Sequence, residues 1–178
     1  RLHQQARERN QAKEEMSWHV FPEISGGGYF FDLASHQFDY LDFLLGEVTE
    51  VKGTAANLAG LYPAEDTVSG TWRHASGVIG TGSWCFVVGE SAEEDSIDII
   101  GETGRISLPC FSPGNLVLEK QGGTTEMKFN NPRHISENLV RQVVNELRGA
   151  GTCVSTGVSA ARTSWVMDEM VKDYYSLQ

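Results

Sequence analysis

The chain has 178 residues, a formal net charge of -10 and 40% hydrophobic residues. This length suits one domain and is enough to bury a core. The acidic balance leaves no broad cationic surface for nucleic acid or anionic lipid, so neither is expected as a partner. No apolar run approaches the ~20 residues that a membrane span needs, and membrane insertion is not expected either.

The three cysteines, Cys85, Cys110 and Cys153, are widely spaced and contain no Cys-x-x-Cys pair. This pattern indicates neither a disulfide framework nor a zinc knuckle, and reduced thiols favour a cytoplasmic location. The chain begins with Arg1, and its first fifteen residues contain no apolar signal-peptide segment. We therefore expect a piece of a longer protein, whose targeting signal would lie outside the sequence.

Residues 1–16 are polar and rich in good helix formers, which predicts a frayed helix or an arm that orders on contact. Residues 17–178 are expected to form one α+β domain. Its first part, residues 17–28, predicts an irregular loop that ends in three glycines. A helix is predicted over residues 29–45, because Ala34, Phe38, Leu41 and Leu45 form one apolar stripe and Gly46 supplies a stop.

From residue 48 onward, short β-rich runs alternate with turns, which favours a large, open and mostly antiparallel sheet with helices packed on one face. Trp72 and Trp84 are expected on the other face, as part of a partner-binding surface. Two helices are predicted at the end, one after Ser136 and one from Ser155 to Tyr174. The predicted strands are residues 48–59, 66–74, 77–88, 96–100, 105–108, 116–120 and 124–129.

The sharpest chemical signal is Asp32 four residues before His36, on the helix face opposite the apolar stripe. An aspartate there can orient an imidazole and stabilise its protonated form, as a general acid/base requires. Two other interpretations stay open: a solvated helix face with no function, or a divalent metal site that adds Asp39. The metal site is disfavoured, because catalytic zinc usually recruits two closely spaced histidines. Trp18 is either a core residue or an apolar wall for a sugar ring or nicotinamide.

Nucleotide-binding fingerprints are absent from the sequence. A dinucleotide site needs Gly-x-Gly-x-x-Gly between a strand and a helix, and neither Gly80-Thr81-Gly82 nor the glycine triplet completes that spacing. No phosphate loop and no Gly-x-Ser-x-Gly nucleophile elbow occurs. The sequence thus predicts no cofactor-binding residues in this chain.

The ordered set of motifs resembles the C-terminal domain of the Gfo/Idh/MocA oxidoreductases, the relatives of glucose-fructose oxidoreductase and inositol dehydrogenase. Later segments agree with this resemblance, namely the Gly- and Ser-rich run over residues 77–84, the Ile-x-Gly-x-x-Gly turn over residues 99–104 and the helix over residues 155–168. The motifs that carry it at the start are Trp18, Ser25-Gly26-Gly27-Gly28, Asp32, His36, Asp39, Leu45-Gly46 and Val48-Thr49-Glu50-Val51.

The resemblance implies a two-domain enzyme whose N-terminal Rossmann domain binds NAD or NADP and is absent from this chain. It also implies that the large sheet, similar to that of the C-terminal domains of dihydrodipicolinate and glyceraldehyde-3-phosphate dehydrogenases, mediates homo-oligomers. By position, His36 matches the acid/base histidine, Asp32 a substrate-orienting aspartate and Trp18 an aromatic residue of the substrate pocket. His19 stands at a substrate-contacting position where many relatives carry arginine, and the catalytic lysine of the family belongs to the absent domain.

These expectations combine into one functional hypothesis and one alternative. The chain is predicted to be the substrate domain of an NAD(P)-dependent oxidoreductase that acts on a sugar or polyol, with His36 as acid/base, and to be inactive alone. The alternative is a non-catalytic binding or oligomerisation module with the same fold.

Overall fold

The computed structural model describes residues 1–7, 16–130 and 132–176. The chain divides into two compact units, Arg1–Ser96 with Arg162–Gln178, and Ile97–Ala161. This differs from the single domain expected over residues 17–178, and each unit is described by itself. Among the described residues, no helix is both long and apolar enough to cross a membrane.

The first unit is built on a five-stranded sheet with the order β2-β3-β4-β1-β5. All neighbouring strands are antiparallel except β1 and β4, which are parallel. The largely antiparallel sheet is therefore confirmed, with strands somewhat shorter than predicted. Their bounds are β1 Leu2–Gln5, β2 Val48–Ala56, β3 Thr67–His74, β4 Ile79–Val88 and β5 Glu94–Asp95.

Strand β1 corrects the prediction for the start of the chain. Leu2 is fully buried and lies opposite Trp84 in the sheet, so residues 2–5 form a strand and not a frayed helix, in agreement with the other alternative, an arm that orders on contact. The pairing of β1 with β4 and the burial of one leucine outweigh the local helix propensity. The rest of the predicted arm, residues 8–15, lies outside the described residues.

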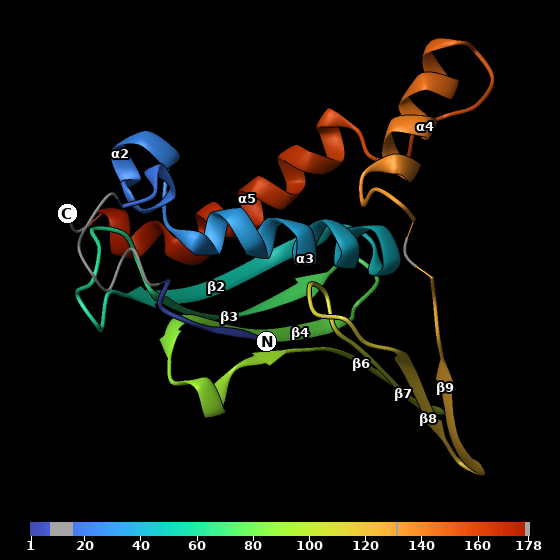
Figure 1. Ribbon diagram of the computed structural model, residues 1–178, viewed down its shortest axis with the longest axis horizontal. Coiled ribbons are helices and arrows are strands. Elements are labelled where there is room, and N and C mark those ends of the chain that lie inside the picture. The colour runs from blue at the N-terminus through green and yellow to red at the C-terminus, as the bar shows by residue number, and fades with distance from the viewer. Residues whose placement is uncertain (8–15, 131, 177–178) are drawn as a thin grey trace. The chain divides into compact units, whose positions relative to one another are not determined.

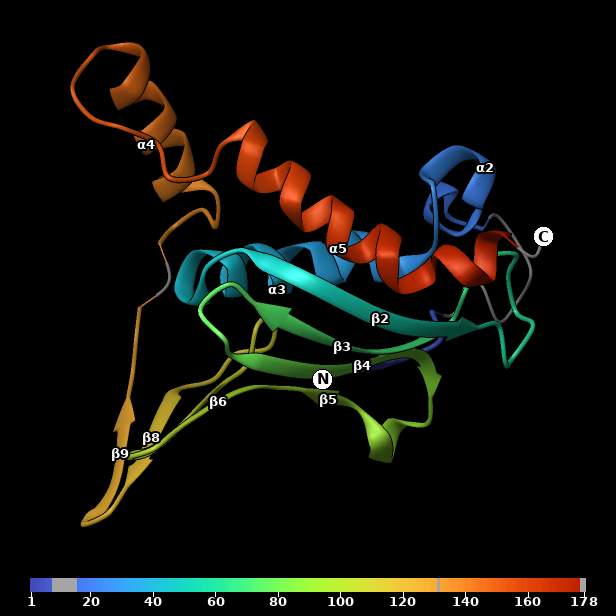
Figure 2. The same ribbon diagram turned by 180° about the vertical axis from the view of Figure 1, so that it is seen from behind.

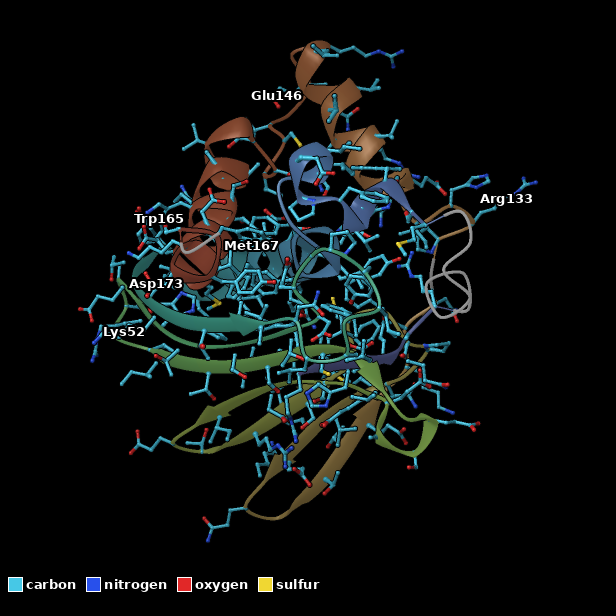
Figure 3. The ribbon with its side chains drawn as sticks, turned by 90° about the vertical axis from the view of Figure 1, so that its left-hand side faces the viewer. Lys52, Arg133, Glu146, Trp165, Met167 and Asp173 are labelled. Carbon is cyan, nitrogen blue, oxygen red and sulfur yellow. The ribbon has the colours of Figure 1, made fainter. Side chains whose placement is uncertain are left out.

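Helices α3 (Tyr29–Leu45) and α5 (Gly157–Ser176) lie along the same face of this sheet (Figures 1 and 2). The predicted bounds of α3 are confirmed, and Ala34 and Phe38 of its stripe are buried. On its other side His36 is exposed. Along α5, Met167 is directed inward and Trp165 outward, as Figure 3 shows.

A row of glycines allows α5 to lie directly on the sheet. Gly53, Gly70 and Gly82 are opposite one another on β2, β3 and β4. A Cβ atom on Gly53 would lie 2.4 Å from the carbonyl oxygen of Met170, and one on Gly82 would lie 2.5 Å from the Trp84 ring. Because these positions lack side chains, the backbone of α5 and the Trp84 indole can occupy the space above them.

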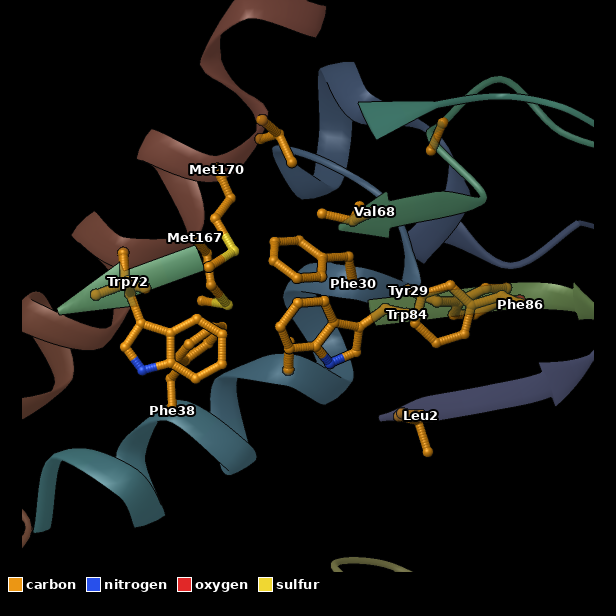
Figure 4. Packing of buried hydrophobic residues seen from close by; sticks show 14 of the residues in the cluster. Leu2, Tyr29, Phe30, Phe38, Val68, Trp72, Trp84, Phe86, Met167 and Met170 are labelled. Carbon is orange, nitrogen blue, oxygen red and sulfur yellow. The ribbon is translucent and has the colours of Figure 1, made fainter. Parts of the chain in front are cut away.

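The predicted position of the two sheet tryptophans is wrong. Trp72 and Trp84 are only 7% and 3% exposed and pack edge-on or tilted against Phe38 in the core (Figure 4). The Trp72 indole N–H donates to His74 Nε2 over 3.1 Å, and the Trp84 N–H donates to Gln37 Oε1 over 2.6 Å. The alternation of side chains between the two faces of these strands was predicted correctly. The faces were assigned wrongly, because the glycines beside the indole rings suggested that the inner face carries no large side chains.

Helices α3 and α5 are also joined by an ion pair with two hydrogen bonds. Arg162 donates from Nε to Asp42 Oδ1 over 3.0 Å and from its terminal nitrogen to Oδ2 over 2.6 Å. The aspartate is buried, whereas the arginine is partly exposed. Hydrogen bonding to Asp42 raises the pKa of Arg162.

Replacing Asp42 by alanine is expected to lower the free energy of unfolding by about 2 kcal/mol, because the guanidinium loses both acceptors. Urea unfolding followed by circular dichroism measures the change. As a control, Asp39→Ala one turn earlier on α3 should change stability by less than about 0.5 kcal/mol. Equal losses in the two variants would contradict the assigned role of Asp42.

The second unit contains an antiparallel four-stranded sheet in the order β6-β7-β8-β9 and helix α4 (Glu137–Leu147). The helix was predicted, but its apolar stripe is exposed at Leu139, Val140, Val143 and Leu147, contrary to the expected packing. The strand bounds are β6 Ile97–Gly101, β7 Gly104–Leu108, β8 Leu116–Lys120 and β9 Gly123–Met127.

Candidate functional site

The three glycines before α3 are each required for a different reason. Gly26 ends the short helix α2 (Pro22–Ser25) with a φ of 82°. A Cβ atom on Gly27 would lie 2.1 Å from the Phe31 ring, and one on Gly28 would lie 2.7 Å from the carbonyl oxygen of Glu65. The triplet therefore lets α3 begin in close contact with the loop that carries Glu65.

Ser25 ties this glycine turn to the segment before it. Its hydroxyl oxygen lies 2.9 Å from the carbonyl oxygen of Phe21, 2.5 Å from that of Gly27 and 3.2 Å from that of His19. His19 belongs to a short 3-10 helix, η1 (Trp18–Val20). The start of α3 and η1 are thus held together by local hydrogen bonding.

Three of the predicted site residues come together at this point: Trp18, His19 and Asp32. The rings of Trp18 and His19 are stacked with centroids 3.9 Å apart, and His19 Nε2 lies 3.9 Å from Asp32 Oδ2. The Ser17 hydroxyl lies 2.7 Å from His19 Nδ1, a contact that the sequence analysis missed. Since Trp18 is 58% exposed, it is not a core residue and presents an open aromatic face.

His36, the predicted acid/base, lies on α3 one helical turn beyond Asp32 and is exposed. The contact between Asp32 and His19 was not predicted, because the sequence analysis considered only partners within the helix. Asp32 thus lies near a histidine of η1 and one helical turn before His36 on its own helix. The orientation of His36 by Asp32 stays a prediction.

A second acidic residue near the glycine turn, Glu65, is fully buried. The N–H of Gly28 donates to its Oε1 over 2.8 Å, and the Tyr175 hydroxyl donates to its Oε2. Burial raises the pKa of Glu65, while these two hydrogen bonds oppose the shift and the charge of Asp66 adds to it. In the sequence, the only sign of this buried carboxyl group was the pair Glu65-Asp66 just before a β-rich run.

Because burial raises the pKa of Glu65 in the folded chain, the native state binds more protons than the unfolded state above the ordinary glutamate range. Its contribution to stability is therefore present at low pH and falls as the pH rises through the raised pKa. Glu65→Gln removes this dependence, so its stability relative to the parent chain should increase with pH. Urea unfolding across the acidic to neutral range measures the difference, and a difference that is constant with pH would contradict the expectation.

The geometry gives no support to the metal-site alternative. In the part of the chain that the structure describes, no group of three His, Cys, Asp or Glu side chains is placed to hold a metal ion. Asp32, His36 and Asp39 share a helix face, but they do not form such a group.

The glycine turn does not fit the pyrophosphate of a dinucleotide. A pyrophosphate site needs backbone N–H groups that point at the ligand. Here the N–H of Gly28 donates to Glu65, and that of Gly26 donates to the carbonyl oxygen of Pro22. Two of the three glycine N–H groups are therefore used inside the chain, where the turn seats the start of α3.

Comparison with solved structures supports the fold. A levoglucosan dehydrogenase in complex with NADH and levoglucosan aligns with a TM-score of 0.81 at 15% identity, covering 99% of this chain and 55% of that protein. A UDP-N-acetylglucosamine 3-dehydrogenase from Acidithiobacillus ferrooxidans aligns with a TM-score of 0.73 at 15% identity, covering 99% and 52%. At these identities the likeness shows the shared fold alone.

Sequence comparison extends beyond the fold. A curated relative, Oxidoreductase P35 from Formosa agariphila, is 31% identical over 157 residues, which are 88% of this chain and 47% of the relative. The chain thus spans about half the length of the proteins it matches. Residues 2–107 match the family model of the GFO/IDH/MocA C-terminal domain. Because this match covers more than half of the sequence, the chain belongs to the GFO/IDH/MocA C-terminal domain family.

Proposed function

We propose that this chain is the substrate-binding part of an NAD(P)-dependent oxidoreductase that acts on a hydroxyl or carbonyl group of a sugar or polyol. The observation that carries the proposal is the cluster of Trp18, His19 and Asp32 at the start of α3, with His36 one turn further on. The family membership and the sugar dehydrogenases among the structural neighbours support the same substrate class.

Each side chain has a distinct role in this proposal. The open face of Trp18 stacks on the apolar side of a sugar ring, as exposed aromatic rings commonly do. The carboxylate of Asp32 accepts hydrogen bonds from substrate hydroxyls and balances positive charge on the histidines. His36 removes the proton of the reacting hydroxyl during oxidation, and returns it during reduction.

The nicotinamide cofactor, which takes up or supplies the hydride, would be bound outside this chain. Two observations support this assignment: the glycine turn does not fit a pyrophosphate, and the chain spans about half of the length of its relatives. The chain alone is therefore expected to be inactive. The cytoplasmic location suggested by the wide spacing of Cys85, Cys110 and Cys153 in the sequence stays a prediction.

We also propose that the outer face of the five-stranded sheet forms a homo-oligomer. With both tryptophans in the core, this face carries mainly polar side chains on β2, β3 and β4, a surface that a second copy could cover. Those residues, identified by their pairing across the strands, are Lys52, Thr54, Ser69, Thr71, Thr81 and Ser83. The same surface favours the second candidate function, a non-catalytic oligomerisation module.

The decisive experiment joins this chain to a preceding dinucleotide-binding domain and follows NADH or NADPH formation with a panel of neutral sugars and polyols. Turnover by the joined protein and none by the chain alone is the expected result. If no member of the panel gives substrate-dependent turnover, the proposed oxidoreductase function is contradicted and the non-catalytic oligomerisation module is favoured. Light scattering on the joined protein separately tests assembly, and a monomer at micromolar concentration would contradict the interface.

A further inference from the structure

The buried carboxylate of Glu65 joins parts of the chain that are far apart in sequence. It lies two residues before β3, and its oxygens accept hydrogen bonds from the Gly28 N–H at the start of α3 and from the Tyr175 hydroxyl near the end of α5. Both carboxylate oxygens are thereby used inside the protein.

The backbone around Glu65 also holds η1. The N–H of Ala64 donates to the carbonyl oxygen of Val20 over 3.2 Å, and Gly28 is so close to Glu65 that a Cβ atom would meet its carbonyl oxygen at 2.7 Å and its carboxyl carbon at 3.0 Å. Tyr29, the first residue of α3, packs edge-on against Tyr62 of the same loop with centroids 5.7 Å apart. One short loop thus contacts both elements that carry the candidate site.

A carboxylate is a costly group to bury, and an apolar residue of similar volume can stabilise a core equally well. What an apolar residue cannot do is accept two directed hydrogen bonds, which are stronger when the acceptor is charged. The two donors are Gly28, the residue just before α3, and Tyr175 on α5. Together the two hydrogen bonds hold the first turn of α3 in place relative to α5.

We propose that Glu65 is a positioning residue of the substrate site. It touches neither substrate nor cofactor, and it holds the start of α3 against η1 so that Asp32 and His36 face a substrate stacked on Trp18. This inference rests on the proposed oxidoreductase function.

The next residue, Asp66, provides a matched control. It is as deeply buried as Glu65. Its carboxylate accepts hydrogen bonds from the N–H groups of Leu58 and Ala59 over 3.0 and 2.7 Å and from the Thr67 hydroxyl over 2.9 Å. Asp66 therefore holds the beginning of the same β2–β3 loop, and none of these hydrogen bonds reaches α3, α5 or η1.

The first measurement uses the joined enzyme, with each variant assayed well below its own unfolding midpoint. Glu65→Ala leaves the Gly28 N–H without its acceptor and is expected to lower kcat about 10- to 100-fold, the effect of a displacement near 1 Å in a catalytic group. Glu65→Gln keeps an oxygen acceptor and should restore most of the wild-type kcat. Asp66→Ala should lose stability but keep its kcat.

The second measurement follows amide hydrogen exchange in the same joined proteins. Glu65→Ala should speed exchange at Gly28 about tenfold or more, as expected for the loss of its hydrogen-bond acceptor, whereas Asp66→Ala should speed exchange at Leu58 and Ala59. Should Glu65→Ala fail to fold, Tyr175→Phe removes one of the two hydrogen bonds and is expected to give a smaller fall in kcat.

The outcomes separate this inference from the function on which it rests. Equal falls in kcat for Glu65→Ala and Asp66→Ala, or an unchanged kcat and unchanged Gly28 exchange in Glu65→Ala, would overturn the positioning role. If the wild-type joined protein reduces no cofactor, the proposed function fails, and the exchange of Gly28 still decides whether Glu65 fixes the start of α3.

Discussion

In the joined enzyme, His36→Ala is expected to lower the turnover number about 100-fold or more, the usual cost of removing a general acid/base. The imidazole is exposed on α3 one turn beyond Asp32, so its loss should leave the core and the overall stability unchanged. The measurement is kcat at saturating substrate, accompanied by a thermal unfolding curve for each protein.

His134→Ala is the matched control for this prediction. His134 is also an exposed histidine, but it lies just before α4 and away from η1 and α3 in sequence and element. Its replacement should leave turnover unchanged. Near-wild-type turnover in His36→Ala would refute the acid/base assignment and would leave Trp18, His19 and Asp32 as a binding cluster without a catalytic base.

The largest expected effect on stability is at Gly53. Gly53→Val is expected to lower the free energy of unfolding by about 3 kcal/mol, the upper range for forcing extra carbon atoms into a packed core. Its Cβ atom would lie 2.4 Å from the Met170 carbonyl oxygen and 2.6 Å from the Met170 Cα. These are backbone atoms of α5, so a side-chain rotation cannot relieve the overlap, and the helix must move away from the sheet.

The neighbouring residue on β2, Thr54, provides the control, because successive side chains of a strand point to opposite faces. Thr54 is exposed, and Thr54→Val adds no atoms toward the helix, so its effect should stay within about 0.5 kcal/mol. Urea unfolding of both variants measures the contrast. A Gly53→Val variant as stable as Thr54→Val would show that α5 does not lie directly on the glycine row.

The burial of Trp72 and Trp84 changes the physical basis of the proposed assembly. An exposed aromatic patch would drive association by the burial of apolar surface. The outer face instead carries the hydroxyl groups of serine and threonine side chains, together with Lys52. Any interface there would be polar and would depend on hydrogen bonds between the two surfaces. The proposed catalytic residues and the proposed interface therefore lie on different sides of the sheet, with α3 and the candidate site on the helix-covered side.

Local sequence patterns were enough to predict the helices and strands that are specified by residues close together in the chain. The apolar stripe from Ala34 to Leu45 and the stop at Gly46 predicted α3 with its correct bounds, because a 3.6-residue period is a local property of the chain. Alternation and turn residues likewise predicted the strands that follow, and the placement of Asp32 and His36 on one face of α3 needed only the helix period.

Only the tertiary structure decided which surfaces meet. Strand β1 pairs with β4 across some eighty residues, Trp72 and Trp84 turn inward because α3 and α5 cover that face, and Glu65 is buried under a glycine turn thirty-seven residues away in the chain. The pairing of His19 with Asp32 is of the same kind. Each of these contacts joins residues that no local pattern relates, since their free energy comes from packing and hydrogen bonds that exist only after the chain has folded.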